Sequence, residues 1–460
     1  MSTKAKSDFS TGSVYRHILS LAVPMTIAQL VQLLYNMVDR IYIGHLPGES
    51  FLALTGLGLT FPIVTIVMAV TNLFGVGGAP LFSIARGRKD EKQAQRIMGN
   101  AFFMLCICSF AVMLLCFVFM KPVLYLFGAS DESYPYAAAY LRIYLLGTPF
   151  IMITSGMNGF INAQGFGKTG MVTVTLGAAI NILLDPLFIF VLDLGVRGAA
   201  LATVLSQSIS AAWVLAFLFG KRSLIRISWS SMKPEGKILS DMTKLGMAGF
   251  IMSASNGVVQ VACNATLRGV GGDLYVGIMT VLNSVRELFF LPMTGITHAA
   301  QPVMGYNYGA ELFDRVKKSI RFTTVTTVTY MIAAWLVVFL FPGPIMGIFS
   351  SDASLIAAGI PCMHVYYFGM FFMAFMMTGQ STFVGLGMSK HSIFFSLLRK
   401  VIVVVPLTIL LPKIPALGVM GVFLAEPISN VIGAAGSYFT MLHVTRRVFR
   451  QKELEKLQNS

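Results

Sequence analysis

Twelve long apolar runs dominate the sequence, and they constrain its fold more than any other feature. Each is close to the roughly 20 residues that a helix needs to cross the hydrocarbon layer of a bilayer. Only 12% of the residues are charged, whereas a soluble globular protein carries about 25%. We therefore predict an all-α membrane protein with twelve transmembrane helices. The runs lie near residues 14–43, 51–83, 98–120, 137–163, 171–192, 199–220, 245–267, 274–304, 319–341, 361–384, 393–411 and 422–443.

The formal net charge of +15 could indicate a nucleic-acid partner, so the placement of the basic residues has to decide. If the N-terminus is cytoplasmic, 25 of the 34 lysines and arginines fall in segments on the cytoplasmic side. The opposite side holds only Lys121, Arg197, Arg268 and Lys413. This asymmetry follows the positive-inside rule. We therefore predict a multi-pass protein of the plasma (inner) membrane with both termini cytoplasmic, in which the lipid bilayer, and not nucleic acid, explains the basic excess.

The two halves of the chain follow one plan. A shift of about 222 residues places Pro80 and Gly87 on Pro302 and Gly309. Further matches are Phe127 with Phe349, Gly165 with Gly387, Lys168 with Lys390, and Leu-Gly-Val-x-Gly at 194–198 with 417–421. Six is an even number, so both copies enter the membrane from the same side, which predicts two six-helix bundles related by pseudo-twofold symmetry. The expected parts are an N-terminal lobe (1–220), a cytoplasmic linker (221–244), a C-terminal lobe (245–443) and a cytoplasmic tail (444–460).

A duplication of this kind favours a cavity between the halves that opens alternately to either side of the membrane, as transporters require. The alternative is that the duplication only builds a stable bundle. Channels and intramembrane enzymes less often have this plan, so the architecture indicates transport.

Polar residues in the first, fifth and sixth runs can form one site near the outer surface. Asp39 lies about four residues before the outer end of the first helix. Asn181 and Asp185 are spaced i, i+4, so they share a face of the fifth helix, and Ala199 and Thr203 have the same spacing in the sixth. Acidic residues at such depth are costly and usually functional. The pattern predicts two carboxylates, an amide and a hydroxyl in a compact outer-leaflet site.

Such a site can bind a coupling cation. Two neighbouring carboxylates raise each other's affinity for a proton, and carboxylate, amide and hydroxyl oxygens can also hold sodium, with Asp39 and Asp185 as its ligands. Two structural alternatives stay open. Asp185 precedes Pro186 and could cap a new helix, and Asp39, beside Arg40, could be an interface residue at a helix end. The second half lacks these acids, which argues that the scaffold does not require them.

The C-terminal half offers candidates for substrate binding. Glu287 could face a cavity and attract cationic substrates, or it could form a buried ion pair. Glu426 precedes Pro427 and is interpreted as a cap or kink. The stretch at 366–377 is rich in aromatic residues and methionines, which make adaptable walls for hydrophobic ligands, although contact with lipid explains them almost as well. Its candidate substrate residues are Phe371, Phe375 and Met376.

Taken together, these residues resemble a known family. Pro24 and Asp39 in the first helix, NILLDPLFIF from Asn181, LGVRGAALAT at 194–203 and twelve helices in two halves are similar to the multidrug and toxic compound extrusion (MATE) family. The resemblance implies a secondary active exporter, acting as a monomer, that exchanges lipophilic or cationic drugs or toxins for protons or sodium ions. It places cation binding on Asp39, Asn181, Asp185, Ala199 and Thr203, with Tyr35 and Asn158 as additions.

The sequence departs from the family pattern in one respect, and two alternative functions have to be considered. Some family members carry acids in the seventh and tenth helices, and this sequence has none there. A lipid-linked saccharide flippase of the same superfamily would share the helix plan but should have a strongly cationic cavity. A membrane enzyme is the second rival, but HExxH, GxSxG and a complete phosphate-binding loop are absent, so we expect neither catalysis nor a cofactor.

Overall fold

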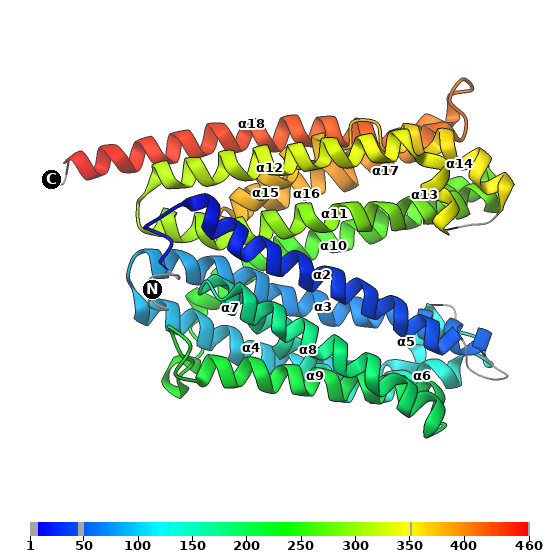
Figure 1. The fold of residues 1–460 in the computed structure, drawn as a ribbon, viewed down its shortest axis with the longest axis horizontal. Helices are drawn as coiled ribbons and strands as arrows, with labels where there is room; N and C mark the ends of the chain where they lie inside the picture. Colours follow the sequence, from blue (N-terminus) through cyan, green and yellow to red (C-terminus); the bar gives the residue numbers. More distant parts are fainter. Residues whose placement is uncertain (1–7, 45–49, 128, 350–351, 459–460) are drawn as a thin grey trace. The chain divides into compact units, whose positions relative to one another are not determined.

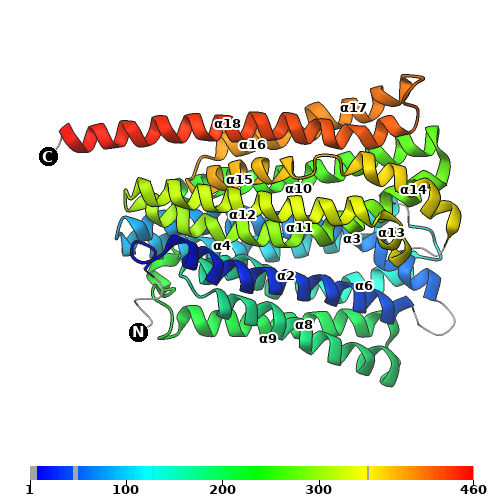
Figure 2. The same ribbon diagram turned by 45° about the horizontal axis from the view of Figure 1, so that its top comes forward.

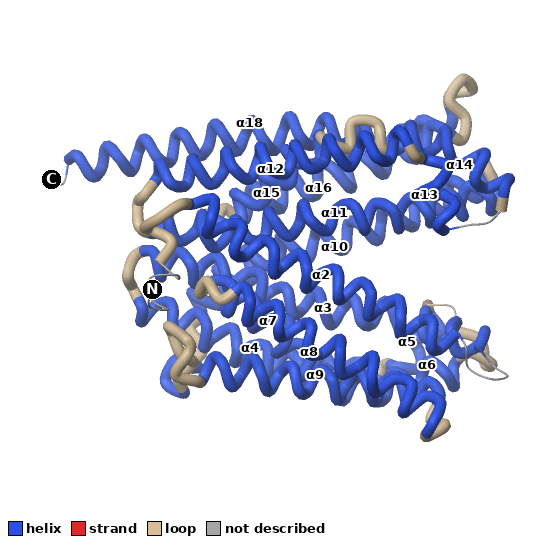
Figure 3. The backbone as a smooth tube through the Cα atoms, viewed as in Figure 1, coloured by secondary structure: helices blue, strands red, loops and turns tan. Residues whose placement is uncertain are grey.

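The computed structural model describes residues 8–44, 50–127, 129–349 and 352–458. Throughout these residues the chain forms helices, turns and loops without any strand (Figure 3). The chain divides into two compact units. The first comprises Met1–Thr11 and Val23–Gly246, and the second comprises Gly12–Ala22 and Met247–Ser460. Two helices belong to both units, α2 (Val14–Gly44) and α10 (Gly236–Val270).

The first unit is built around α3, α7 and α9. The bounds of these three helices are Ser50–Gly87 for α3, Thr148–Ala163 for α7 and Gly195–Phe219 for α9. The remaining helices of this unit are α4 (Glu91–Val118), α5 (Met120–Leu126), α6 (Tyr134–Leu146) and α8 (Gly167–Pro186). Helix α3 packs on α4, α6 and α7, and α9 packs on α6, α7 and α8. Helices α8 and α9 lie side by side in two views (Figures 1 and 2).

Glycines allow α3 and α7 to approach closely. A Cβ atom added to Gly75 of α3 would lie 2.8 Å from the Cα atom of Gly156 in α7. Helices in lipid gain stability from such close packing, because association in an apolar solvent has little hydrophobic driving force. The two glycines therefore permit the close contact between α3 and α7 at the centre of the first unit.

The second unit repeats the helical plan. Its helices after α10 are α11 (Gly272–Gly309), α12 (Phe313–Leu340), α13 (Pro342–Phe349), α14 (Ala353–Tyr366), α15 (Phe372–Gly385), α16 (Ser389–Leu397), α17 (Val405–Leu410) and α18 (Met420–Gln458). Helix α15 packs on α11, α12 and α18. The long α18 runs beside α17 in Figure 2.

All twelve predicted runs coincide with helices in the described residues, which confirms the predicted fold class. Nine described helices are long and apolar enough to cross a membrane, and the bent pair of α6 and α7 meets the same criteria when it is taken as one span. The runs at 361–384 and 422–443 correspond to α14 with α15 and to the first half of α18.

Two runs expected to be continuous are broken, each for a local reason. Helices α6 and α7 meet at an angle of 57°, because Pro149 in the first turn of α7 cannot continue the hydrogen bonding of the preceding helix. The break between α14 and α15 contains Gly369, whose φ of +66° lies in the left-handed region. Glycine adopts this conformation at little steric cost.

The segment expected as a linker is partly helical. A short 3₁₀ helix covers Trp229–Met232 and α10 begins at Gly236. The buried side-chain oxygen of Gln164, at the end of α7, accepts hydrogen bonds from the hydroxyl of Ser223 and from the backbone amides of Leu224 and Ile225. This contact holds the start of the segment against the first unit.

The surfaces of the units carry many large apolar side chains. Examples are Leu114 and Val118 on α4, Leu183 on α8 and Val261 on α10, which are all more than half exposed. A protein surrounded by water rarely exposes so many such residues in extended areas. Contact with lipid explains them.

Candidate functional site

The centre of the candidate site is the contact between α8 and α9 in the first unit. Asn181 and Asp185 occupy one face of α8 and are both fully buried. With the amide of Asn181 oriented by its hydrogen bonds, its nitrogen donates to Oδ2 of Asp185 at 3.0 Å and its oxygen accepts from the backbone amide of Thr203 at 3.1 Å. Asn181 therefore joins the carboxylate on α8 to α9.

Helix α2 contributes Tyr35 and Asp39, which are spaced i, i+4 on one face. The hydroxyl of Tyr35 lies close to the side chain of Thr203, and the carboxylates of Asp39 and Asp185 both act on Tyr35 electrostatically. The two carboxylates also interact with each other. Asp39 is buried, with 8% of its surface exposed. The structure therefore brings together the two acids that the sequence places 146 residues apart.

Two tyrosines of α6 complete the surroundings of this cluster, and the sequence interpretation missed them. Tyr140 lies close to the side chain of Thr203 and interacts electrostatically with Asp39. Tyr144 lies one turn further along α6, and its ring stacks on that of Tyr140 with centroids 5.8 Å apart. Both are buried. Two tyrosines at i, i+4 in an apolar run share a face, and that spacing was the available signal.

The two remaining residues predicted for the cation site, Ala199 and Asn158, lie in different places. Ala199 is buried one turn before Thr203 on α9, so it belongs with the cluster. The side chain of Asn158 instead donates to the backbone oxygen of Gly170 at 3.2 Å. It lines a different cavity of about 200 Å³ between α2, α7 and α8. That cavity is also lined by Met25, Ala28, Gln29, Gln32, Asn162, Gly170, Met171 and Val174.

The structure removes the alternative that Asp185 caps a new helix. Helix α8 runs without interruption through Asp185 and ends at Pro186, and the side chain of Asp185 faces back toward Asn181. The π-helical segment Leu187–Val191 follows immediately. Proline lacks the amide hydrogen that a regular helix needs at this place, which accounts for the irregular turn. Single π-helical turns of this kind often occur at functional sites.

The predicted substrate residues of the second unit lie in different surroundings. Glu287 is exposed on α11. Phe371 packs edge-on against Trp335, and Phe375 packs edge-on against Tyr438. Met376 is buried in the core of the second unit. None of the four lines the two described cavities.

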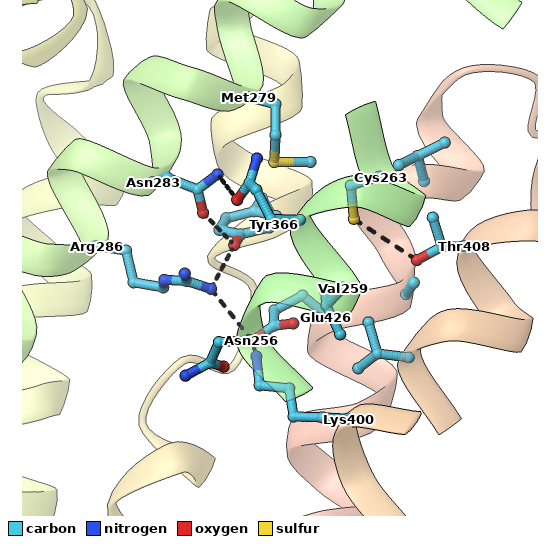
Figure 4. Close-up of a pocket in the computed structure, with 14 residues that line it drawn as sticks. Asn256, Val259, Cys263, Met279, Asn283, Arg286, Tyr366, Lys400, Thr408 and Glu426 are labelled. Atoms are coloured by element: carbon cyan, nitrogen blue, oxygen red, sulfur yellow. Dashed lines mark hydrogen bonds and ion pairs between the residues drawn. The ribbon is translucent and has the colours of Figure 1, made fainter. Parts of the chain in front are cut away.

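The interpretation of Glu426 as a helix cap is wrong, whereas a kink at Pro427 stays a prediction. Helix α18 begins six residues earlier and continues past Pro427, so Glu426 does not cap it. Its carboxylate is buried and forms ion pairs with Arg286 and Lys400 (Figure 4) and with Arg399. These three cations lie on separate stretches of sequence in α11 and in the π-helical segment Leu398–Val404. Sequence reasoning missed the cluster because no single segment contains it.

The chain is similar to known families and proteins. The MatE family profile matches residues 24–187 and 250–410 of the chain. The multidrug export protein MepA of Staphylococcus saprophyticus is 29% identical over 350 residues, which are 76% of this chain and 76% of that protein. MepA of Staphylococcus aureus is 25% identical over the same shares of the two chains.

Solved structures with the same fold cover almost the whole chain. An outward-facing multidrug resistance MATE family transporter of the MOP superfamily matches with a TM-score of 0.91 and 24% identity, covering 98% of this chain and 100% of that one. A MOP superfamily transporter from Pyrococcus furiosus, described as having a binding pocket of reversed polarity, matches with a TM-score of 0.90 and 24% identity, covering 97% and 99%. These likenesses confirm the twelve-helix fold.

Proposed function

Because the chain belongs to the MatE family of transporters, we propose that it is a secondary active multidrug exporter that exchanges lipophilic or cationic small molecules for protons or sodium ions. Its relatives of known name are multidrug export proteins, and its apolar helices suit a multi-pass membrane protein. The chain is a transporter by family, and its expected substrates are drugs or toxins. It acts as a monomer in the plasma membrane with both termini cytoplasmic.

One observation carries the coupling mechanism: Asp39 and Asp185 are buried together on neighbouring helices. Their carboxylates interact across the cluster that Asn181 and Thr203 complete. Two like charges in an apolar environment repel each other, so the uptake of a proton or a sodium ion stabilises the pair. Amide and hydroxyl oxygens beside the carboxylates are ligands that suit sodium.

Cation uptake gives the exporter its source of free energy. The carboxylates lie on α2 and α8, so neutralising them reduces the electrostatic repulsion between these helices. A unit charge that moves inward across the membrane releases about 2.3 kcal/mol per 100 mV of membrane potential. Exchange at this site can therefore drive export of a substrate against its concentration gradient.

Efflux from proteoliposomes tests the proposal. The purified protein is reconstituted with a fluorescent cationic dye, and either a pH gradient or a sodium gradient is imposed. We expect one of the two gradients to accelerate dye transport and a matched Asp185→Asn protein to show no such acceleration. Dye transport that responds to neither gradient would contradict ion coupling, and no dye transport under any condition would contradict the exporter itself.

The rival function is a lipid-linked saccharide flippase, which requires positive charge for the phosphate groups of its substrate. Arg286, Arg399 and Lys400 supply three cations in the second unit, but they surround the buried Glu426, and the cavity beside them, of about 20 Å³, is too small for a phosphate group. The same proteoliposomes, loaded with a fluorescent lipid-linked saccharide, separate the two functions. Rapid inward or outward movement of that lipid, together with no transport of dye, would favour the flippase.

A further inference from the structure

The second unit buries three cations around one carboxylate. The Nζ atom of Lys400 and the Nη1 atom of Arg286 lie 3.5 Å and 3.8 Å from Oε1 of Glu426. Arg399 donates to the same oxygen through Nη2. One negative charge balances only one of the three positive charges. Two positive charges therefore remain without a counter-charge inside the cluster.

Neighbouring groups do not supply the missing negative charge. Asn430 accepts a hydrogen bond from Arg399 at 2.8 Å, and Tyr366 accepts one from Arg286 at 3.0 Å, but both partners are neutral. Glu287 attracts Arg286 electrostatically. Its side chain is exposed, however, and even if it is counted one positive charge is left over.

Unbalanced positive charge at this depth is costly. Arg399 and Lys400 are 2% and 6% exposed, and the Nε atom of Arg399 has no hydrogen-bond partner among the described residues. A buried cation is tolerated in a membrane protein when a counter-charge and hydrogen bonds compensate its lost hydration. The cluster is therefore incomplete as a purely internal ion-pair network.

A small cavity lies beside the unbalanced cations. Its volume is about 20 Å³, and its lining includes Arg286, Lys400, Glu426, Asn283 and Tyr366 (Figure 4). A cavity needs roughly 10–15 Å³ to hold one water molecule. This space consequently admits one particle of about that size and excludes sulfate or phosphate. Arg286 and Lys400 present charged N–H donors, which suit an anion, whereas the hydroxyl of Tyr366 already donates to Asn283 and the amide of Asn283 donates to Gln260.

We propose that this cavity binds one small monovalent anion of halide size between Arg286 and Lys400. The bound anion supplies part of the missing negative charge. It also links α11 to the π-helical segment Leu398–Val404 and, through Glu426, to α18. This site lies wholly in the second unit and is distinct from the cation cluster of α2, α8 and α9. Its occupancy does not depend on the exporter function.

Binding of radioactive chloride to the purified full-length protein tests the site. We expect saturable binding of one chloride per chain, displaced by bromide and not by sulfate or gluconate. The melting temperature should rise with the logarithm of chloride concentration when gluconate is replaced at constant ionic strength. Absence of saturable binding by the wild-type protein would overturn the proposal, as would equal displacement by sulfate and bromide.

Variants assign the bound anion to the cavity. Lys400→Met and Arg286→Gln should each lower chloride affinity at least tenfold and remove the dependence of melting temperature on chloride. Lys121→Met, which removes an exposed cation of the first unit, serves as the matched control and should leave both unchanged. If one of the two cluster variants fails to fold, the other variant and the displacement of chloride from the wild-type protein still test the proposal. Binding that survives in both cluster variants would identify an adventitious ion only and overturn the proposal.

Discussion

At the scale of single residues, the proposed function depends on a few charged side chains that are costly to bury in an apolar environment. Asp39 and Asp185 interact electrostatically, and Asn181 donates a hydrogen bond to Asp185 while it accepts one from the backbone amide of Thr203. The spacing of Asn181 and Asp185 predicted their common face correctly. Whether they bind protons or sodium remains a prediction.

Replacing either acid by its amide should abolish export. Asp39→Asn and Asp185→Asn keep the size of the side chain but remove its charge, so neither the repulsion nor the exchangeable cation site persists. We expect drug resistance of cells that express either variant to fall to that of cells without the protein, at unchanged protein level. Asp131→Asn, at an exposed acid on the surface, provides the control and should retain full resistance. Full resistance in both site variants would contradict the coupling site.

At the scale of elements, the two lobes depend on close helix contacts and on well-formed helix ends. Gly75 and Gly156 permit the contact of α3 with α7 that supports the first unit. Helix breaks at Pro149 and Gly369 divide two membrane-spanning runs. The proline just after the first break was visible in the sequence, but the bend of 57° depends on how α6 and α7 pack.

A single methyl group should test the contact between α3 and α7. Gly75→Ala would place a Cβ atom 2.8 Å from the backbone of Gly156, which forces the helices apart. Overpacking of this kind typically costs about 1–3 kcal/mol of stability. Gly58→Ala on the same helix adds a methyl group where no atom lies within 4 Å. Thermal unfolding in detergent should show a lower melting temperature for Gly75→Ala only, and equal values for both variants would contradict the tight contact.

The start of α14 should respond to pH through Asp352. Hydrogen bonds from the hydroxyl of Ser354 and from the backbone amides of Ser354 and Leu355 lower the pKa of this capping carboxylate. Because the pKa is lower in the folded than in the unfolded state, the cap stabilises α14 at neutral pH and is lost as pH falls through the lowered value, below about pH 4. The loss of the cap is measured by hydrogen exchange of the Leu355 amide in the wild-type protein and in the Asp352→Asn variant, whose side chain does not titrate. An equal ratio of the two exchange rates at pH 7 and pH 3 would contradict it.

At the scale of the whole molecule, two related units carry opposite charges at their polar sites. The first unit buries two acids with amide and hydroxyl partners. The second buries three cations around Glu426. Duplication explains the common helical plan, whereas the buried charged residues differ between the two copies, as the two proposed sites require.

Labelling of introduced cysteines tests the orientation in the membrane. Gln458→Cys in the C-terminal tail and Lys413→Cys between α17 and α18 should lie on opposite sides if the positive-inside rule sets the topology. In a background without the five native cysteines, an impermeant maleimide should label Lys413→Cys in intact cells. It should label Gln458→Cys only after the membrane is permeabilised. The reverse pattern would invert the predicted topology.

Much of this protein follows from its sequence because apolar runs and their internal repeat are properties read along the chain. They determined the helical spans, the family resemblance and the common face of Asn181 and Asp185. Only the tertiary structure decided that Tyr140 lies beside these acids, that Asn158 faces another cavity, and that Glu426 pairs with three cations. The physical reason is that hydrophobic runs have the same composition whether they contact lipid or another helix, so they indicate spans without indicating which faces pack together.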